Sequence, residues 1–290
     1  MADQEKLLPE WKAWRLQNVV WNEEERERRK QFVSGYKPPT NCSVSQLNIQ
    51  LYGQVGSGKS SFLNTINSVY KGRVSAQAMT GNQSTSLTKK YRPYEVRTQQ
   101  DGEALCFRLC DTMGLEEANT GLHLDDVSYL LDGNVPDGYQ FNADVRITPA
   151  TTGFKSTTSL KDRPHCVVLV MDAKNISVMP EDTVDKLKAI YRKALDREIP
   201  TVILLTKIDK ACEHIADDLS LVFRSKFILE KVEEVSGKFG PSETHIFPVQ
   251  NYSRQSALEN RIDILALEAM AQILGFADDY LQNHLTKPVL

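Results

Sequence analysis

The sequence predicts an α/β fold in three layers, with a mostly parallel sheet covered by helices on both faces. Three observations lead to this prediction. Short apolar runs alternate with helix-length amphipathic segments along most of the chain. The longest apolar runs, 167–171 and 202–205, have the length of buried strands. A glycine-rich loop joins the first strand-like run to the first helix-like segment that follows it.

The elements can be assigned in chain order. We expect strands at 47–52, 94–98, 105–110, 166–171, 201–205 and 245–249. We expect helices at about 59–70, 181–196, 217–238 and 257–283. Pro180 followed by two acidic residues marks a helix start, and Ser256 with Glu259 forms a capping box before the last helix.

The two ends of the chain are predicted to add helices to this core. Leu7, Trp11, Trp14, Asn18 and Trp21 recur at helical spacing, so residues 1–36 read as a helical lead. Its apolar stripe is expected to pack on the body of the same molecule, with a dimer contact as the alternative. The predicted organisation is a lead and linker at 1–44, a central domain at 45–256 with an insertion at about 115–164, and a C-terminal helical segment at 257–290 packed on that domain.

Composition excludes several classes of protein. The chain has 290 residues, 41% apolar and 25% charged, with a net charge of −3, so a general nucleic-acid binder is not expected. No apolar run approaches the length of a membrane span, and the first residues lack a signal-peptide core. Five scattered cysteines do not form a disulfide framework. These features together favour a soluble protein in a reducing compartment.

The loop Gly53-Gln-Val-Gly-Ser-Gly-Lys-Ser60 fits the phosphate-binding pattern G-x-x-x-x-G-K-[ST]. Backbone N–H groups at a helix N-terminus attract phosphate oxygens, and glycines let the loop wrap closely around them. Lys59 is expected to reach the β- and γ-phosphates and Ser60 to bind Mg²⁺. A plain glycine-rich turn is the alternative. The expected nucleotide contacts here are Gly53, Val55, Gly56, Ser57, Gly58, Lys59, Ser60 and Ser61.

Two later motifs select the metal and the base. Asp111 ends an apolar strand, where its carboxylate can hold Mg²⁺, and the N–H of Gly114 can approach the γ-phosphate. Thr206-Lys-Ile-Asp209 follows another strand. The Asp209 carboxylate can accept two hydrogen bonds from guanine, which adenine cannot offer, and the Lys207 stem can lie along the base. The three motifs in this order predict a site for GTP or GDP and disfavour an ATP-using enzyme.

The motif set resembles the P-loop GTPases, and the surrounding sequence resembles the interferon-induced protein 44 family. The stretches that carry the resemblance are Gly53–Asn64, Ser128–Asn134, Gln140–Asn142, Ser159–Arg163, His165–Val167 and Asn251–Ser253. It covers roughly residues 45–283. The resemblance implies a P-loop GTPase-type fold and a cytoplasmic GTP-binding protein of the innate antiviral response. It also implies that Asn251, Tyr252 and Ser253 contact the guanine ring.

The catalytic assignment is Lys59, Thr85 and Gly114, and the metal assignment is Ser60, Thr85 and Asp111. Thr85 is preferred among the hydroxyl residues of 80–88 as the first-switch group that closes over Mg²⁺. Leu115 occupies the place after Gly114 where many GTPases carry a water-positioning Gln. We therefore expect slow hydrolysis, which a partner's arginine or self-assembly can accelerate. The alternative is a GTP-binding pseudo-GTPase, or nucleotide-gated scaffold, that acts through protein contacts.

Two segments carry charge of one sign. Residues 111–137 contain Asp111, Glu116, Glu117, Asp125, Asp126, Asp132 and Asp137 and no Lys or Arg. Residues 71–97 contain Lys71, Arg73, Lys89, Lys90, Arg92 and Arg97 against Glu95 alone. We hypothesise that these surfaces face each other, within one molecule or across a GTP-dependent homodimer. Two separately solvated faces are the alternative.

Overall fold

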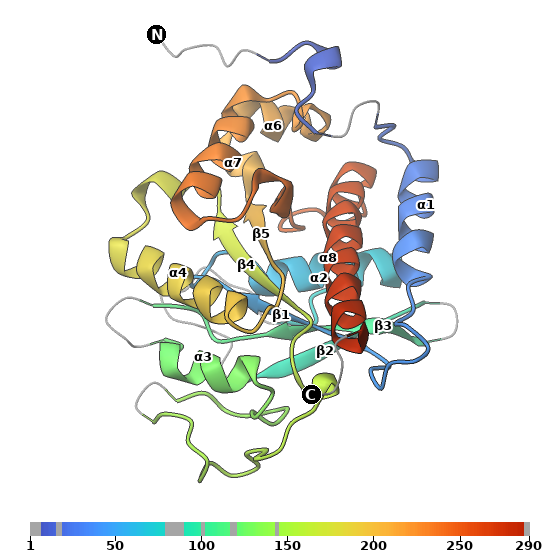
Figure 1. The fold of residues 1–290 in the computed structure, drawn as a ribbon. Coiled ribbons are helices and arrows are strands. Elements are labelled where there is room, and N and C mark those ends of the chain that lie inside the picture. The colour runs from blue at the N-terminus through green and yellow to red at the C-terminus, as the bar shows by residue number, and fades with distance from the viewer. Residues whose placement is uncertain are drawn as a thin grey trace.

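The strands form one sheet in the order β2-β3-β1-β4-β5-β6, shown in Figure 1. The structure, a computed structural model, describes residues 7–15, 19–78, 90–99, 102–116, 121–142 and 145–286. The strands are β1 (Leu47–Tyr52), β2 (Arg92–Arg97), β3 (Ala104–Asp111), β4 (Cys166–Asp172), β5 (Thr201–Thr206) and β6 (Ile246–Pro248). β2 pairs antiparallel with β3, and every other neighbouring pair in this sheet is parallel. The predicted α/β class with a mostly parallel sheet is confirmed.

Helices cover both faces of the sheet. The longer ones are α1 (Glu23–Ser34), α2 (Lys59–Lys71), α3 (Leu124–Leu131), α4 (Glu181–Leu195), α7 (Lys226–Phe239) and α8 (Asn260–Thr286). The short helices α5 (Ile208–Ala211) and α6 (Glu213–Asp217) follow β5. α2 and α8 pack together on one face with α1 outside them, whereas α3 and α4 pack together on the other (Figure 1). None of the helices in the described ranges is long and apolar enough to cross a membrane.

The central strands are buried along their whole length because helices cover them on both sides. Every residue of β1, β4 and β5 is buried. Polar side chains in β1 are satisfied inside the core: the Asn48 amide donates to the carbonyl oxygens of Lys161 and Arg163 at 3.0 and 2.9 Å. Because β1, β3, β4 and β5 run parallel, their C-terminal ends lie at one edge of the sheet. That edge carries the candidate site.

The predicted helix through the tryptophan stripe is wrong for residues 7–15. There the chain forms only a short 3₁₀ turn at Glu10–Lys12 after Pro9. Backbone hydrogen bonds tie this segment to the body instead, since the Trp14 N–H donates to the Phe223 carbonyl at 3.0 Å. Trp14 and Trp21 both pack on the Phe223 ring, with centroids 5.3 and 6.3 Å away. Trp14 and Trp21 of the stripe therefore do pack on the body of the molecule, although from an irregular segment rather than a helix.

The helix predicted over 217–238 is also divided. α6 ends at Asp217, a 3₁₀ turn spans Leu219–Leu221, and α7 begins at Lys226. The Asp218 side chain accepts from the Ser220 N–H, and the Ser225 hydroxyl accepts from the Ile228 N–H. Asp218 therefore caps the 3₁₀ turn that follows α6, and Ser225 caps the start of α7. In each case a side-chain oxygen satisfies a backbone N–H that has no partner within its own helix.

The acidic segment 111–137 is partly neutralised within the molecule. Its ion pairs with cations outside the basic segment are Asp125–Arg146 at 2.9 Å, Asp132–Arg197 at 2.8 Å and Asp137–Arg108 at 3.4 Å. The two segments do touch through the backbone, since Arg92 lies opposite Asp111 in the antiparallel ladder of β2 and β3. Lys89 and Glu117 lie outside the described residues.

The C-terminal helix is fixed by polar contacts as well as by apolar packing. Arg29 of α1 forms an ion pair with Glu268 of α8, and the Tyr36 hydroxyl donates to the Asp278 carboxylate at 2.9 Å. Asp263 is fully buried in α8 and accepts from the Tyr252 hydroxyl at 2.7 Å. Burial raises the pKa of the Asp263 carboxyl to about 6, although the Tyr252 hydrogen bond and the α1 cations oppose that shift.

We expect Asp263→Asn to raise the free energy of unfolding above that of wild type at pH 7, and to have a much smaller effect at pH 4. The raised folded-state pKa means that the ionised carboxylate destabilises the native state at pH 7. As the pH falls below about 6 the carboxyl becomes protonated in the native state, and this destabilisation disappears. A shift from 3.8 to about 6 corresponds to roughly 3 kcal/mol. Urea unfolding at both pH values measures the difference between variant and wild type. Asp279→Asn, on the exposed side of the same helix, is the matched control; a pH-independent effect of Asp263→Asn would contradict this account.

Candidate functional site

The glycine-rich loop lies against the ends of two neighbouring strands. It leaves β1 at Tyr52 and enters α2 at Lys59. A Cβ on Gly53 would lie 2.2 Å from the Val170 carbonyl oxygen, so only glycine permits this approach to β4. Gly58, which precedes α2, has a φ of 105°, in the region that favours glycine. The predicted strand–loop–helix context is therefore present, and α2 points its N-terminal N–H groups into the loop.

Lys59 is held inside the loop. Its side chain is buried, and its ammonium donates to the carbonyl oxygens of Gly53 and Gln54 at 2.9 and 3.0 Å. Burial lowers the pKa of this ammonium to about 8, and the Asp111 carboxylate opposes part of that shift. The loop thus carries a desolvated cation close to its backbone, which is an arrangement suited to an incoming anion.

Ser60 and Asp111 come together at the start of α2. The Ser60 hydroxyl donates to an Asp111 carboxylate oxygen at 2.7 Å, and Asp111 is almost completely buried at the end of β3. The next residue fixes this strand end, because the Thr112 hydroxyl donates to the Leu51 carbonyl at 2.6 Å. A hydroxyl and a carboxylate side by side are oxygen ligands of the kind that Mg²⁺ takes. This pair fits the predicted metal site.

The segment after Asp111 is paired to the phosphate loop. The Leu115 N–H donates to the Gly53 carbonyl at 3.0 Å, and the Val55 N–H donates to the Leu115 carbonyl at 3.2 Å. Gly114 lies so close to Val55 that an added Cβ would be 2.6 Å from a Val55 methyl group. Leu115 is buried against this loop, while the predicted Thr85 and the rest of 79–89 lie outside the described residues.

The loop after β5 reaches the phosphate loop from the other side. The Thr206 hydroxyl donates to the Ser57 carbonyl at 2.5 Å. Lys207 has a left-handed backbone, with a φ of 57°, and its ammonium pairs with the Asp172 carboxylate at 2.7 Å. Asp209 is half-buried, and that burial raises the pKa of its carboxyl above the ordinary value. Thr206 therefore ties this loop to the phosphate loop, Asp172 holds the Lys207 ammonium, and Asp209 follows two residues later in the same loop.

The loop after β6 completes this group. The Asn251 amide donates to the Gly58 carbonyl at 3.4 Å and accepts from the Thr65 hydroxyl at 3.3 Å. Tyr252 is buried; its N–H donates to the Thr65 hydroxyl at 3.1 Å, and its own hydroxyl reaches Asp263 in α8. Asn251 thus lies next to the phosphate loop, whereas the Tyr252 side chain anchors its loop to the last helix.

The structure thus brings the described predicted residues of three motifs to one edge of the sheet. Sequence reasoning missed Asp172 and Thr65, which position Lys207 and the Asn251 loop. Asp172 carried a usable signal, since it is a carboxylate directly after a buried run, at the end of a central strand. Thr65 carried no such signal, because it positions the Asn251 loop only through a hydrogen bond to a residue far away in the sequence.

Comparison with known proteins gives a clear relationship in sequence. No protein-family profile matches the chain. A solved structure described as a probable GTP-binding protein engB aligns with 70% of this chain and 88% of its own, at 15% identity and a TM-score of 0.37.

Curated relatives match nearly the whole chain. Human interferon-induced protein 44-like is 38% identical over 269 residues, which are 92% of this chain and 59% of the relative. Human interferon-induced protein 44 is 38% identical over 89% of this chain and 58% of its own, and the mouse protein is 35% identical over 87% and 60%. The chain therefore spans about three fifths of the length of these relatives. Over that shared region, the chain is similar in sequence to the interferon-induced protein 44 family.

Proposed function

We propose that this chain binds GTP and GDP with Mg²⁺ and hydrolyses GTP slowly. The observation that carries the proposal is the meeting of Lys59, the Ser60–Asp111 pair and the Thr206–Asp209 loop around one glycine-rich loop. Each group supplies a different requirement of a guanine nucleotide: charge for its phosphates, oxygen ligands for its metal and a carboxylate for its base.

Phosphate binding would let the Lys59 ammonium exchange its backbone carbonyl partners for phosphate oxygens. In the structure its ammonium is solvated by two backbone carbonyls, which are weaker partners than phosphate oxygens. The backbone N–H groups at the start of α2, from Gly58 to Ser61, add donors and the positive end of the helix dipole. An incoming di- or triphosphate would therefore be favoured by a desolvated cation together with oriented dipoles.

The metal and the base are assigned to the flanking residues. Ser60 and Asp111 would hold Mg²⁺, with Thr85 as the expected third contributor, and the ion would neutralise phosphate charge and polarise the phosphoryl group. Asp209 would accept from the guanine N1–H and amino group, while Lys207 lies along the ring. Asn251, Tyr252 and Ser253 would border the base through their loop.

Leu115 supports slow turnover and favours the runner-up function. A buried leucine cannot orient a water molecule, and its backbone pairing with Gly53 and Val55 holds that segment in place. The same backbone pairing also supports a nucleotide-gated scaffold. In that function, displacement of the Leu115 segment would change a contact with another protein. Measuring phosphate release from bound GTP distinguishes these two functions, because a slow GTPase releases phosphate and a scaffold without hydrolysis does not. A cytoplasmic role in innate antiviral defence is a proposal drawn from the family. Assembly into a GTP-dependent dimer is a proposal drawn from the oppositely charged segments 71–97 and 111–137.

Replacing Asp209 by Asn should remove guanine selectivity. The amide cannot accept both guanine donors, so we expect GDP affinity to fall at least about 100-fold. Titration calorimetry with GDP, a non-hydrolysable GTP analogue and ATP, each with Mg²⁺, measures the change. Asp217→Asn, on the exposed surface of α6, is the control and should bind GDP like wild type. Undiminished GDP binding by Asp209→Asn would rule out the base assignment.

The affinity for GDP should fall as the pH rises toward 8.5. Only the charged form of Lys59 attracts phosphate, and its free pKa of about 8 means that it is mostly neutral at the higher pH. We expect about a fourfold loss of affinity between pH 7 and pH 8.5, with proton uptake on binding. Calorimetry in two buffers of different ionisation enthalpy measures both. Lys59→Arg keeps its charge and should show no such loss; a flat profile for wild type would refute this role.

A further inference from the structure

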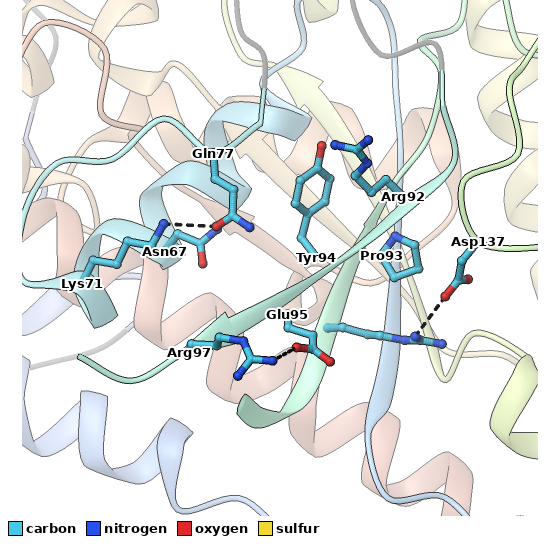
Figure 2. A pocket seen from close by; sticks show the side chains of 10 residues that line it. Asn67, Lys71, Gln77, Arg92, Pro93, Tyr94, Glu95, Arg97 and Asp137 are labelled. Atoms are coloured by element: carbon cyan, nitrogen blue, oxygen red, sulfur yellow. Dashed lines mark hydrogen bonds and ion pairs between the residues drawn. The ribbon is translucent and has the colours of Figure 1, made fainter. Parts of the chain in front are cut away.

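A polar cavity lies beside the edge strand of the sheet. It has a volume of about 580 Å³ and opens between the C-terminal half of α2 and strand β2, as Figure 2 shows. We call it the edge groove. The side chains that carry the argument are Asn67, Lys71, Arg92, Glu95, Arg97 and Arg108. None of them belongs to the site assigned above to the nucleotide.

The edge groove has an excess of positive charge. Of its lining residues, four are cations, and the acids are Glu95 and Asp137. Arg97 pairs with Glu95 at 2.5 Å, and Arg108 pairs with Asp137 at 3.4 Å. Lys71 donates to the neutral side chains of Ser75 and Gln77, both at 3.2 Å. Neither Lys71 nor Arg92 forms an ion pair with any residue in the described ranges.

Asn67 adds an unsatisfied donor to this wall. It lies one helical turn before Lys71 on α2, so both side chains project on the same side of the helix. Its side chain is only 1% exposed, and its amide nitrogen has no hydrogen-bond partner in the described structure. A buried amide without an acceptor destabilises a fold, which makes it a place where a ligand oxygen would be favoured.

The spread of the cations sets the size of the ligand. Arg92 and Arg97 lie at opposite ends of β2, and five strand residues extend about 17 Å. This is the separation of the two Cα atoms, and one phosphate group matches so wide a spread of arginines poorly. Several anionic groups on one scaffold match it better, and a cavity of this volume accommodates a small molecule.

We propose that the edge groove binds a ligand carrying two or more phosphate groups. Lys71 and Arg92 supply unpaired charge, the Asn67 amide donates to a phosphate oxygen, and Arg97 and Arg108 exchange exposed carboxylate partners for phosphate. The same chemistry is found in a soluble inositol polyphosphate and in a phosphoinositide headgroup on a membrane. The groove does not depend on the proposed nucleotide site.

The soluble probe is inositol hexakisphosphate, and titration calorimetry measures its binding to the full chain. Lys71→Gln with Arg92→Gln should weaken binding at least about tenfold, since two charge-assisted contacts are lost. Asn67→Ala should weaken it by a smaller factor. The matched control is Lys188→Gln with Arg192→Gln, which removes one lysine and one arginine from α4 and should bind like wild type. Thermal melting verifies that each variant is folded.

A second arm separates the sources of phosphate. Vesicles containing phosphatidylinositol 4,5-bisphosphate are compared with phosphatidylserine vesicles of equal charge; selective loss of binding to the former in the Lys71/Arg92 variant supports a headgroup in the groove. Lys59→Ala removes the loop cation of the nucleotide site and should leave binding of both probes unchanged. The proposal is overturned if Lys59→Ala abolishes binding, if the Lys71/Arg92 variant binds both probes like wild type, or if wild type binds neither.

Discussion

The close packing of the glycine-rich loop against the ends of β4 and β5 is the constraint on which the rest of the site depends. Gly53 leaves no room for a side chain beside the Val170 carbonyl, and Thr206 donates to the Ser57 carbonyl at 2.5 Å. These contacts fix both ends of the loop to strands that are themselves completely buried. The loop is therefore held against the sheet at Gly53 and at Ser57, and α2 starts from it at Lys59.

That packing creates an electrostatic requirement. With the loop packed on the sheet, Lys59 is buried. Among the described residues its ammonium donates to the backbone carbonyls of Gly53 and Gln54, and the Asp111 carboxylate opposes the lowering of its pKa. A buried cation with neutral partners is poorly compensated, and a phosphate group would compensate it better. The pairing of Leu115 with Gly53 and Val55 closes the same space from the other side. Under the proposed function, nucleotide binding and the position of the 114–116 segment are linked through this space.

Much of this architecture could be predicted from the sequence, because local signals and the global fold agree. The uninterrupted apolar runs of β4 and β5 indicated buried parallel strands, and the glycine-rich loop marked its own strand–helix junction. The lead at 7–15 could not be predicted, because helical spacing of Leu7 and Trp14 does not reveal that backbone pairing with Phe223 and Arg224 is available. The break at Asp218 could be recognised only from its caps, and the Lys207–Asp172 pair required the order of strands in the sheet.

The measurement that tests the central claim most directly is amide hydrogen exchange with and without GDP and Mg²⁺. If a guanine nucleotide occupies the loop, exchange should slow together in residues 53–61, 111–116 and 206–210, because all three segments meet at that place. Exchange in α7, which packs on α4 and β6 and supplies no residue of the proposed site, should stay as it is. Protection spread evenly over the chain, or none in the glycine-rich loop, would contradict the account.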